Sequence, residues 1–432
     1  MNLWEDDLMP VTIVTGGQWG DEGKGRIVDM LAAEADIVVR CQGGPNAGHT
    51  IVNDLGKFVL HTVPSGIFSE RSRSVIGPGV VISPAGLATE LQELAAAGID
   101  ISRLLISERA HLIMPYHKLF EHLDEEGHSG TLRLGSTKQG VGPAYADKAA
   151  RTGIQAGDLR DLSSFARRLK EVLPIKNRIL EGVYGNSPLN ADDIISAIEP
   201  AAAFLKPFIG DTSIPLHDAL GSGKRVLLEG QLGMMRDLDW GAYPYVTSSC
   251  PSPSGMVAGA GIPPQHVDRV IGIVKAYTSA VGEGPFPTEL LNEDGDWLRK
   301  QGAEYGATTG RPRRCGWFDA PAVSWGSRIG GFTEIVLTKL DVLTGRASIP
   351  VCTGYTRAGQ PLSQSEAAYG WQDLQPVYET KPGWIEDLGS CRSMADLPAA
   401  AQDYVAFLEE QIPSPISMVS VGPQRDAIIM RA

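Results

Sequence analysis

The pattern of apolar and polar residues predicts buried strands alternating with amphipathic helices over the first hundred residues. Residues 11–14 form an apolar run that predicts a strand, and a helix is expected at about 25–33. A second strand is expected at 35–40. Further on, two strands at 74–83 and 104–107 flank a helix at 84–97. This strand–helix–strand order is typical of an α/β protein with a parallel sheet.

The rest of the chain continues this pattern with insertions. Residues 158–224 are mostly helical and polar, which predicts a helical and loop-rich subdomain over about 117–224. Without an internal repeat or clear linker, we expect one domain over residues 1–432, with a largely parallel central sheet flanked by helices and interrupted by helical insertions. A long amphipathic helix is expected at 267–281, and the remaining strands at 225–230, 334–337 and 416–421.

Composition and charge narrow the class of protein. The 432 residues carry a formal net charge of −13, which argues against a general nucleic-acid binder because such a protein needs a basic face. No apolar run approaches the ~20 residues that cross a bilayer. The acidic N-terminal segment is unlike a signal peptide, so we expect a cytoplasmic protein without a membrane partner. Five scattered cysteines without a C-x-x-C pair indicate neither a disulfide framework nor a zinc site.

A glycine-rich loop follows the first predicted strand. It reads Gly16-Gly17-Gln18-Trp19-Gly20-Asp21-Glu22-Gly23-Lys24-Gly25. Residues without a Cβ let backbone N–H groups approach a phosphate, and Lys24 would add positive charge. The spacing is not that of a P-loop, and no Ser or Thr follows Lys24 to hold Mg²⁺, so Asp21 is the nearest candidate ligand or base. The alternative is a tight turn that binds no ligand.

Two more loops carry small and polar residues. The second predicted strand leads into Gln42-Gly43-Gly44-Pro45-Asn46-Ala47-Gly48-His49-Thr50. Loops that follow parallel strands share one edge of the sheet, where α/β proteins bind ligands, so His49 is a candidate donor or acid to a phosphoryl oxygen. A third loop, at 135–145, would bind another anionic group, or else form a mobile surface loop.

Charged side chains gather near two later segments. Arg311, Arg313 and Arg314 follow a Thr-Thr-Gly sequence, and their guanidinium groups suit a carboxylate or phosphate; a solvated basic loop is the alternative. The strand at 334–337 ends in Thr338-Lys339-Leu340-Asp341. An aspartate in this position can accept hydrogen bonds from guanine N1 and N2 while the lysine stem packs on the base. A Lys-x-Asp pattern by itself does not establish a guanine nucleotide site.

Together these motifs resemble the adenylosuccinate synthetase family, in the family's order and over nearly the whole chain. The matching segments are 17–25, 42–50, 243–249, 284–290, 308–314 and 337–343. The resemblance implies a P-loop-NTPase-like α/β domain that is usually a homodimer. It also implies a ligase that uses GTP as co-substrate, with Mg²⁺, to join L-aspartate to the 6-oxo position of IMP through a 6-phosphoryl intermediate, in purine biosynthesis.

The resemblance also implies a role for individual residues. Asp21 would take the N1 proton, His49 would act as an acid toward the transferring phosphoryl group, and Lys24 would contact GTP phosphates. Mg²⁺ would be held by Asp21 and Gly48, and Arg151 would reach across the dimer. The implied GTP positions are Gly20, Gly23, Lys24, Gly25, Gly48, Thr50, Lys339, Asp341, Ser420 and Gly422. The implied acceptor-nucleotide positions are Asn46, Thr137, Arg151, Leu232, Arg236, Thr247 and Arg311. The implied aspartate positions are Thr308, Thr309, Arg311 and Arg313.

The chain departs from the family's pattern near the acceptor base. The family's Glu-Gly-Ala-Gln-Gly is Glu229-Gly230-Gln231-Leu232-Gly233 here, so Leu232 replaces the glutamine that contacts the purine edge near O6. Gln231 stands one residue before the position of the family's glutamine. A shift of one residue would normally turn its side chain in the opposite direction from that glutamine. Arg236 occupies a usually apolar position beside the base. In the third loop an arginine is replaced by Gln139, although Lys138 would restore the charge, and Pro312 interrupts the arginine run.

These departures leave two alternatives to ordinary adenylosuccinate synthesis. One is a diverged paralogue that joins aspartate to a different nucleotide, such as GMP, dGMP or a modified purine of viral or specialised metabolism. The other is a non-catalytic nucleotide-binding protein, against which the presence of Asp21, Lys24 and His49 weighs.

Overall fold

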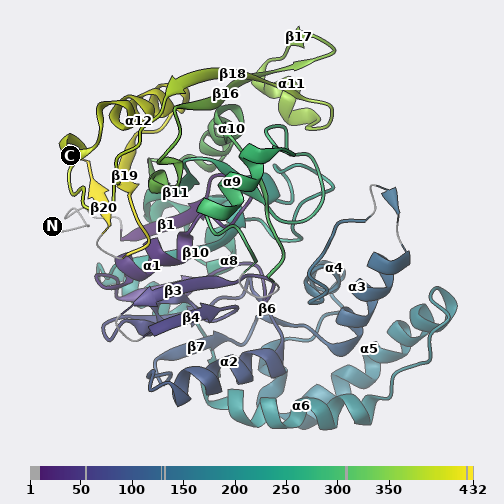
Figure 1. Cartoon of the computed structure of the whole chain (residues 1–432). Coiled ribbons are helices and arrows are strands. Elements are labelled where there is room, and N and C mark those ends of the chain that lie inside the picture. Colours follow the sequence, from purple (N-terminus) through teal and green to yellow (C-terminus); the bar gives the residue numbers. More distant parts are fainter. Residues whose placement is uncertain are drawn as a thin grey trace.

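A large, mostly parallel β-sheet runs through the computed structural model, which describes residues 10–53, 56–127, 129–130, 133–306, 310–424 and 427–431 (Figure 1). All neighbouring pairs in this sheet are parallel except β19 and β20, which are antiparallel. The predicted α/β class with a parallel sheet is confirmed. In spatial order the strands are β20 (Ile428–Met430), β19 (Ile416–Ser420), β15 (Glu334–Thr338), β11 (Val267–Lys275), β1 (Val11–Gly16), β10 (Val226–Gly233), β2 (Ile37–Arg40), β5 (Arg73–Ile76), β7 (Leu104–Ser107) and β9 (Ile209–Gly210).

Shorter strands form small sheets beside the central one. Two antiparallel pairs and one parallel pair are β3 (His49–Asn53) with β4 (Gly56–Leu60), β12 (Thr278–Ala280) with β13 (Arg314–Gly316), and β6 (Val81–Ile82) with β8 (His111–Leu112). A four-stranded sheet contains β14 (Phe318–Asp319), β16 (Ser348–Arg357), β17 (Gln360–Pro361) and β18 (Gln375–Pro382).

Helices cover the sheet and build the insertions. They are α1 (Lys24–Ala32), α2 (Pro84–Ala96), α3 (Pro115–Gly127), α4 (Val141–Ala150), α5 (Leu162–Gly182), α6 (Ala191–Leu205), α7 (Ser213–Gly221), α8 (Pro253–Ala260), α9 (Glu293–Gln301), α10 (Ala320–Gly330), α11 (Gln364–Tyr369) and α12 (Ala399–Gln411). In the part of the chain that the structure describes, no helix combines the length and apolar character needed to cross a membrane.

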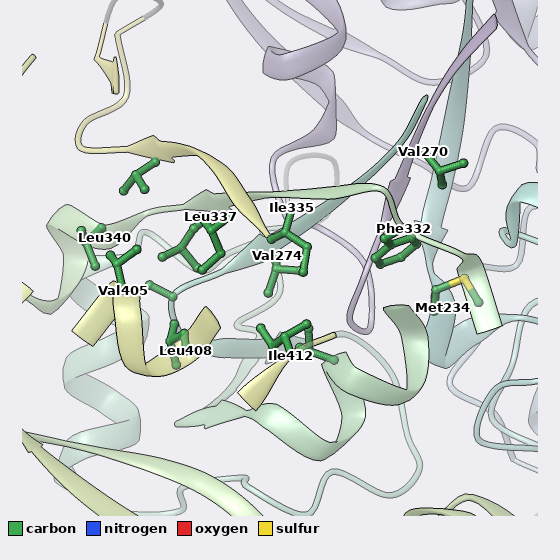
Figure 2. Packing of buried hydrophobic residues seen from close by; sticks show 14 of the residues in the cluster. Met234, Val270, Val274, Phe332, Ile335, Leu337, Leu340, Val405, Leu408 and Ile412 are labelled. Carbon is green, nitrogen blue, oxygen red and sulfur yellow. The ribbon is translucent and has the colours of Figure 1, made fainter. Parts of the chain in front are cut away.

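Apolar side chains cover both faces of the central strands. Ile271 and Ile273 of β11 pack with Val28 of α1, whereas Val270 and Val274 belong to the cluster on the other face. In that second cluster, side chains of β11 and β15 lie over Val405 and Leu408 of α12 and over Ile412, which follows the helix (Figure 2). Successive strand residues point to opposite faces, so a central strand must be apolar at nearly every position.

One predicted element is wrong. Residues 267–281 were expected to form a long amphipathic helix, but the structure contains β11 and then β12 there. Both faces of β11 are buried, so its apolar residues form an unbroken run in which a helical period can also be traced. Tertiary burial and the β-branched residues Val270, Ile271, Ile273 and Val274 favour the strand. The strand expected at 74–83 is also divided, into β5 and β6.

The helices of the insertion lie at one end of the sheet. Figure 1 shows α6 beside α2, and α5 beside α6, at the opposite end of the sheet from β19 and β20. Phe165, Leu169 and Ile198 from α5 and α6 share a buried cluster with Leu91 of α2. The organisation as one domain with a helical subdomain at 117–224 stays a prediction.

We expect Leu408→Ala to lower the free energy of unfolding by about 2–5 kcal/mol, because Leu408 is fully buried between α12 and the sheet. Chemical denaturation monitored by circular dichroism measures this change. Leu291→Ala is the matched control, since that leucine is 89% exposed and its loss should change stability by only about 0.5 kcal/mol or less. Equal effects of the two substitutions would contradict the packing described here.

Candidate functional site

The turn between β1 and α1 is organised around the buried carboxylate of Glu22. Its Oε1 accepts hydrogen bonds from the backbone N–H groups of Gln18 at 3.2 Å and Gly20 at 2.8 Å. Its Oε2 lies 2.5 Å from Lys24 Nζ, and the Lys24 side chain is only 3% exposed. Lys24 therefore pairs with Glu22. The ammonium group would have to shift or share this carboxylate to reach a phosphate.

Asp21 lies beside Glu22 but faces the opposite way. Its backbone adopts a left-handed conformation with φ of 59°, and its side chain is 35% exposed. One carboxylate oxygen, Oδ2, is 2.8 Å from Nε of Arg313. The structure thus brings the predicted base and one predicted aspartate-binding arginine into direct contact.

His49 is held by a buried glutamate. It begins β3, and its Nδ1 lies 2.6 Å from Oε1 of Glu229 on β10. Glu229 also accepts from the backbone N–H and the hydroxyl of Ser65, both at 2.7 Å. The His49 ring lies close to the first loop, because a Cβ built on Gly25 would be 3.2 Å from His49 Cβ. Glu229 fixes the ring, so Nε2 is the nitrogen left for a ligand.

Burial, hydrogen bonds and neighbouring charges together shift the pKa values of His49 and Glu229. Burial lowers the pKa of His49 below its usual value, despite the opposing hydrogen bond and charge of Glu229. Burial raises the pKa of Glu229, but hydrogen bonds from His49 and Ser65 and the charge of Arg40 lower it overall. An ionised Glu229 requires a proton on Nδ1, so neutral His49 presents Nε2 as an acceptor. Anionic phosphates beside the ring would favour the doubly protonated form that can donate.

Gln231 is held by residues of the second glycine-rich loop and by Arg40. Its Oε1 accepts from Arg40 Nη2 at 2.7 Å and from the backbone N–H of Gly44 at 2.9 Å. Its Nε2 donates to Oδ1 of Asn46 at 2.5 Å. A Cβ on Gly43, whose φ is 82°, would lie 1.7 Å from Gln231 Oε1, so only glycine fits there. Gln231 therefore orients Asn46, a predicted acceptor position.

Leu232 and Arg236 lie on either side of the end of β10. Leu232 has a left-handed backbone with φ of 61° and packs close to Gly20. Arg236 Nη1 donates to the carbonyl of Tyr245 at 2.6 Å, and its Nη2 donates to the carbonyl of Val281 at 2.5 Å. Burial, together with the nearby charge of Arg314, lowers the pKa of Arg236 to about 10. The arginine ties two loops together, and its backbone carbonyl accepts from Thr247 N–H at 2.9 Å.

The predicted guanine positions come together at the ends of β15 and β19. Arg26 of α1 donates from Nη1 to Ser420 Oγ at 2.8 Å and to the carbonyl of Gly422 at 2.6 Å. Lys339 follows β15, with φ of 61°, and Asp341 lies two residues later. Burial raises the pKa of Asp341, while the charges of Lys339 and Arg26 oppose that rise. These cations favour the ionised form that could accept from guanine.

Several predicted residues are exposed or partly exposed, and two lie outside the described residues. Thr50, Thr137 and Arg311 are exposed, and Arg151 is exposed at the end of α4 with a left-handed φ of 63°. Gly48 is partly exposed beside His49. Thr308 and Thr309 lie outside the described residues. In the third loop, Lys138 Nζ is 3.1 Å from His122 Nδ1 on α3. The α4 helix is tied to the second loop by Tyr145, whose hydroxyl accepts from Gly43 N–H at 2.9 Å.

Sequence reasoning missed four charged residues that hold the site together. They are Glu22, Arg26, Glu229 and Glu304. Glu229 and Glu304 are fully buried, and a charge within the apolar strand at 225–230 is a signal that could have identified Glu229. Glu22 and Arg26 stand in or beside the glycine-rich loop, but only the fold shows their partners.

The residues present fit a magnesium ion. Mg²⁺ prefers one or two carboxylate or carbonyl oxygens from the protein, with water and phosphate oxygens completing the shell. The Asp21 carboxylate is one third exposed, whereas the neighbouring Glu22 is fully buried and committed to Lys24 and backbone N–H groups. The partly exposed carboxylate of Asp21 could therefore serve as a ligand, whereas that of Glu22 is already bound.

Comparison with known proteins identifies the family. The family model described as adenylosuccinate synthetase matches residues 13–429. The adenylosuccinate synthetase of Carboxydothermus hydrogenoformans is 48% identical over 423 residues, covering 98% of this chain and 99% of that protein. That of Frankia alni is 48% identical over 427 residues, with the same coverage of 98% and 99%.

Two solved structures are also similar. Fully ligated adenylosuccinate synthetase from Plasmodium falciparum has a TM-score of 0.90 and 36% identity, covering 98% of this chain and 100% of that one. Succinoaminodeoxyadenylate synthetase of cyanophage S-2L, bound to dGMP and dATP, has a TM-score of 0.63 and 20% identity, covering 98% of this chain and 96% of that one. The second likeness concerns the fold alone. On the sequence identity, the family model and the shared fold together, this chain belongs to the adenylosuccinate synthetase family.

Proposed function

We propose that this chain uses GTP to join L-aspartate to IMP, forming adenylosuccinate, GDP and phosphate in purine nucleotide biosynthesis. A C–N bond-forming ligase is what membership of the family supports. The observation that carries the proposal is the convergence of three predicted sites at one edge of the sheet. Asp21 contacts Arg313, His49 lies beside the first loop, and the guanine positions lie at the ends of β15 and β19.

The proposed first step makes the purine oxygen a leaving group. Asp21 accepts the N1 proton of IMP, and the resulting negative charge moves to O6. O6 attacks the γ-phosphorus of GTP, a P–O bond forms, and GDP leaves. Protonated His49, supported by Glu229, donates toward the transferring phosphoryl group. Mg²⁺ held by Asp21 and Gly48 would neutralise charge on the GTP phosphates.

The proposed second step uses the aspartate site. The amine of aspartate attacks C6, and the 6-phosphoryl group leaves as inorganic phosphate with its O6 atom. Arg311, Arg313, Thr308 and Thr309 are the proposed aspartate ligands. Because Arg313 Nε lies 2.8 Å from Asp21 Oδ2, the proposed aspartate ligand and the proposed base share one electrostatic environment.

The remaining nucleotide contacts are also proposals. Gly20, Gly23, Lys24, Gly25 and Thr50 would surround the GTP phosphates, and Lys339, Asp341, Ser420 and Gly422 the guanine. Asn46, Thr137, Thr247 and, across a homodimer, Arg151 would bind the 5′-phosphate of the acceptor. The exposure of Arg151 at the end of α4 supports a role toward a second subunit. We place the enzyme in the cytoplasm.

A second candidate is supported by Leu232 and Arg236. Leu232 cannot form the hydrogen bonds of the glutamine it replaces, and losing such a buried partner would cost roughly 1–3 kcal/mol. Arg236 brings a positive charge near Asp21, although its guanidinium is bound to backbone carbonyls. These changes would suit an acceptor other than IMP, such as GMP, dGMP or a modified purine. Binding without catalysis is less well supported, because Asp21, His49 and Glu229 remain in place.

An acceptor assay separates these candidates. With GTP, aspartate and Mg²⁺, we expect IMP to support phosphate release at least about tenfold faster than dIMP, GMP or dGMP, measured as kcat/KM. Formation of the aspartate adduct, followed by mass spectrometry, confirms that phosphate release is coupled to ligation. Efficient turnover of GMP or dGMP with little turnover of IMP would overturn the first candidate in favour of the second.

We expect Asp21→Ala to lower kcat by about a hundredfold or more, because the variant lacks a base for N1. Binding of GDP to the folded variant, measured by calorimetry, should remain detectable. Asp373→Ala is the matched control: Asp373 is exposed and has the same φ of 59°, so it tests the effect of losing an aspartate from a left-handed turn. Condensation by Asp21→Ala at the wild-type rate would rule out this mechanism.

We expect Glu229→Gln to lower kcat about tenfold or more while changing the KM for GTP much less. The amide keeps a neutral oxygen beside His49 Nδ1 but lacks the charge that favours the protonated ring. Glu90→Gln serves as control, because Glu90 is also buried and accepts three consecutive backbone N–H groups away from the site. If both variants are folded and lose kcat equally, Glu229 has no specific part in catalysis.

A further inference from the structure

Glu304 lies between residues of two different proposed substrate sites. Its side chain is fully buried. Oε1 is 2.8 Å from Nζ of Lys339, a proposed guanine ligand, and Oε2 is 2.8 Å from Nη1 of Arg313, a proposed aspartate ligand. A single carboxylate group thus contacts one proposed ligand of GTP and one proposed ligand of aspartate.

Two further donors fix this carboxylate. Lys275 Nζ is 2.7 Å from Oε1, and the hydroxyl of Tyr277 donates to the same oxygen. Burial raises the pKa of Glu304, but the charges of Lys275, Lys339 and Arg313 hold it well below its usual range. Burial also lowers the pKa of Lys275 to about 8. Three cations share one buried anion, so displacing any of them changes the electrostatic environment of the others.

The backbone joins the two sites at the same place. The backbone N–H of Arg313 donates to the carbonyl of Glu304 at 2.9 Å. This hydrogen bond joins the residues on either side of the segment 305–312. Lys339 Nζ donates to the carbonyl of Gly302 at 2.7 Å, two residues before Glu304. Within the short segment 302–304, Gly302 therefore binds Lys339, a proposed guanine ligand, and Glu304 binds the backbone of Arg313, a proposed aspartate ligand.

We propose that Glu304 is a positioning residue that couples guanine nucleotide binding to aspartate binding. Guanine packed on the stem of Lys339 restricts that side chain, its ammonium holds the Glu304 carboxylate, and the carboxylate orients Arg313 for the substrate. Because the coupling is reciprocal, aspartate bound to Arg313 strengthens the hold on GTP. The inference rests on the proposed function, since it takes GTP and aspartate as the ligands.

Glu304→Gln tests the coupling, because it keeps the shape of the side chain and removes its charge. In the wild-type enzyme we expect the KM for aspartate to fall as GTP rises from well below to well above its own KM. In Glu304→Gln we expect that dependence to disappear, the KM for aspartate at saturating GTP to rise about tenfold, and kcat to change less. Calorimetry should show weaker GDP binding by the variant even without aspartate.

Matched variants separate coupling from lost stability. Glu409→Gln breaks another glutamate–arginine pair, with Arg431, and should leave both KM values unchanged. Glu304→Asp keeps the charge but shortens the side chain, so it should recover part of the aspartate affinity. If Glu304→Gln does not fold, the dependence of the aspartate KM on GTP is measured in Glu304→Asp instead. Folding of each variant is checked by circular dichroism.

The proposal fails if folded Glu304→Gln keeps the wild-type dependence of the aspartate KM on GTP, or if only one of the two substrates is affected. It also fails if Glu409→Gln raises both KM values to the same extent. Failure of the proposed function is a different result, because the wild-type enzyme itself would then show no turnover of GTP, aspartate and IMP.

Discussion

Buried carboxylates that must find partners organise the loops at the carboxyl edge of the sheet. A buried charge is costly unless hydrogen bonds and opposite charges surround it. Glu22 gathers two backbone N–H groups and Lys24, Glu229 holds His49 and Ser65, and Glu304 binds three cations and a tyrosine hydroxyl. Glu22 fixes one turn, whereas Glu229 and Glu304 each join separate segments of the chain. Together they hold in place glycine-rich segments that would have little reason to adopt one conformation by themselves.

The parallel sheet determines which loops lie next to one another. Strands β1, β10, β2, β15 and β19 run in the same direction, so the residues that follow them share one edge. Asp21 follows β1, Lys339 follows β15, and Gly422 follows β19. This placement would let a phosphate donor and a purine meet the proposed base, Asp21, beside which Arg313 supplies a cation from a loop far along the chain. The reaction proposed here needs such a meeting of three substrates.

Motifs with fixed spacing could be predicted from the sequence, whereas partners distant in the sequence could not. The glycine-rich turn and the strands at 35–40 and 334–337 follow from local pattern and are confirmed. The strand at 267–275 was mistaken for a helix, because burial on both faces removes the alternation that marks a strand. The partners of Glu22, Glu229 and Glu304 depend on how the chain folds back, as does the binding of Arg236 to the carbonyls of Tyr245 and Val281.

Transfer of oxygen from the purine to phosphate most directly tests whether the reaction proceeds by phosphorylation of O6. IMP labelled with ¹⁸O at position 6 is converted with GTP and aspartate, and the released phosphate is examined by mass spectrometry. Phosphorylation of O6 predicts one ¹⁸O atom in each phosphate formed. Unlabelled phosphate, with the label released to water, would show that the amine displaces the oxygen directly and would contradict the mechanism.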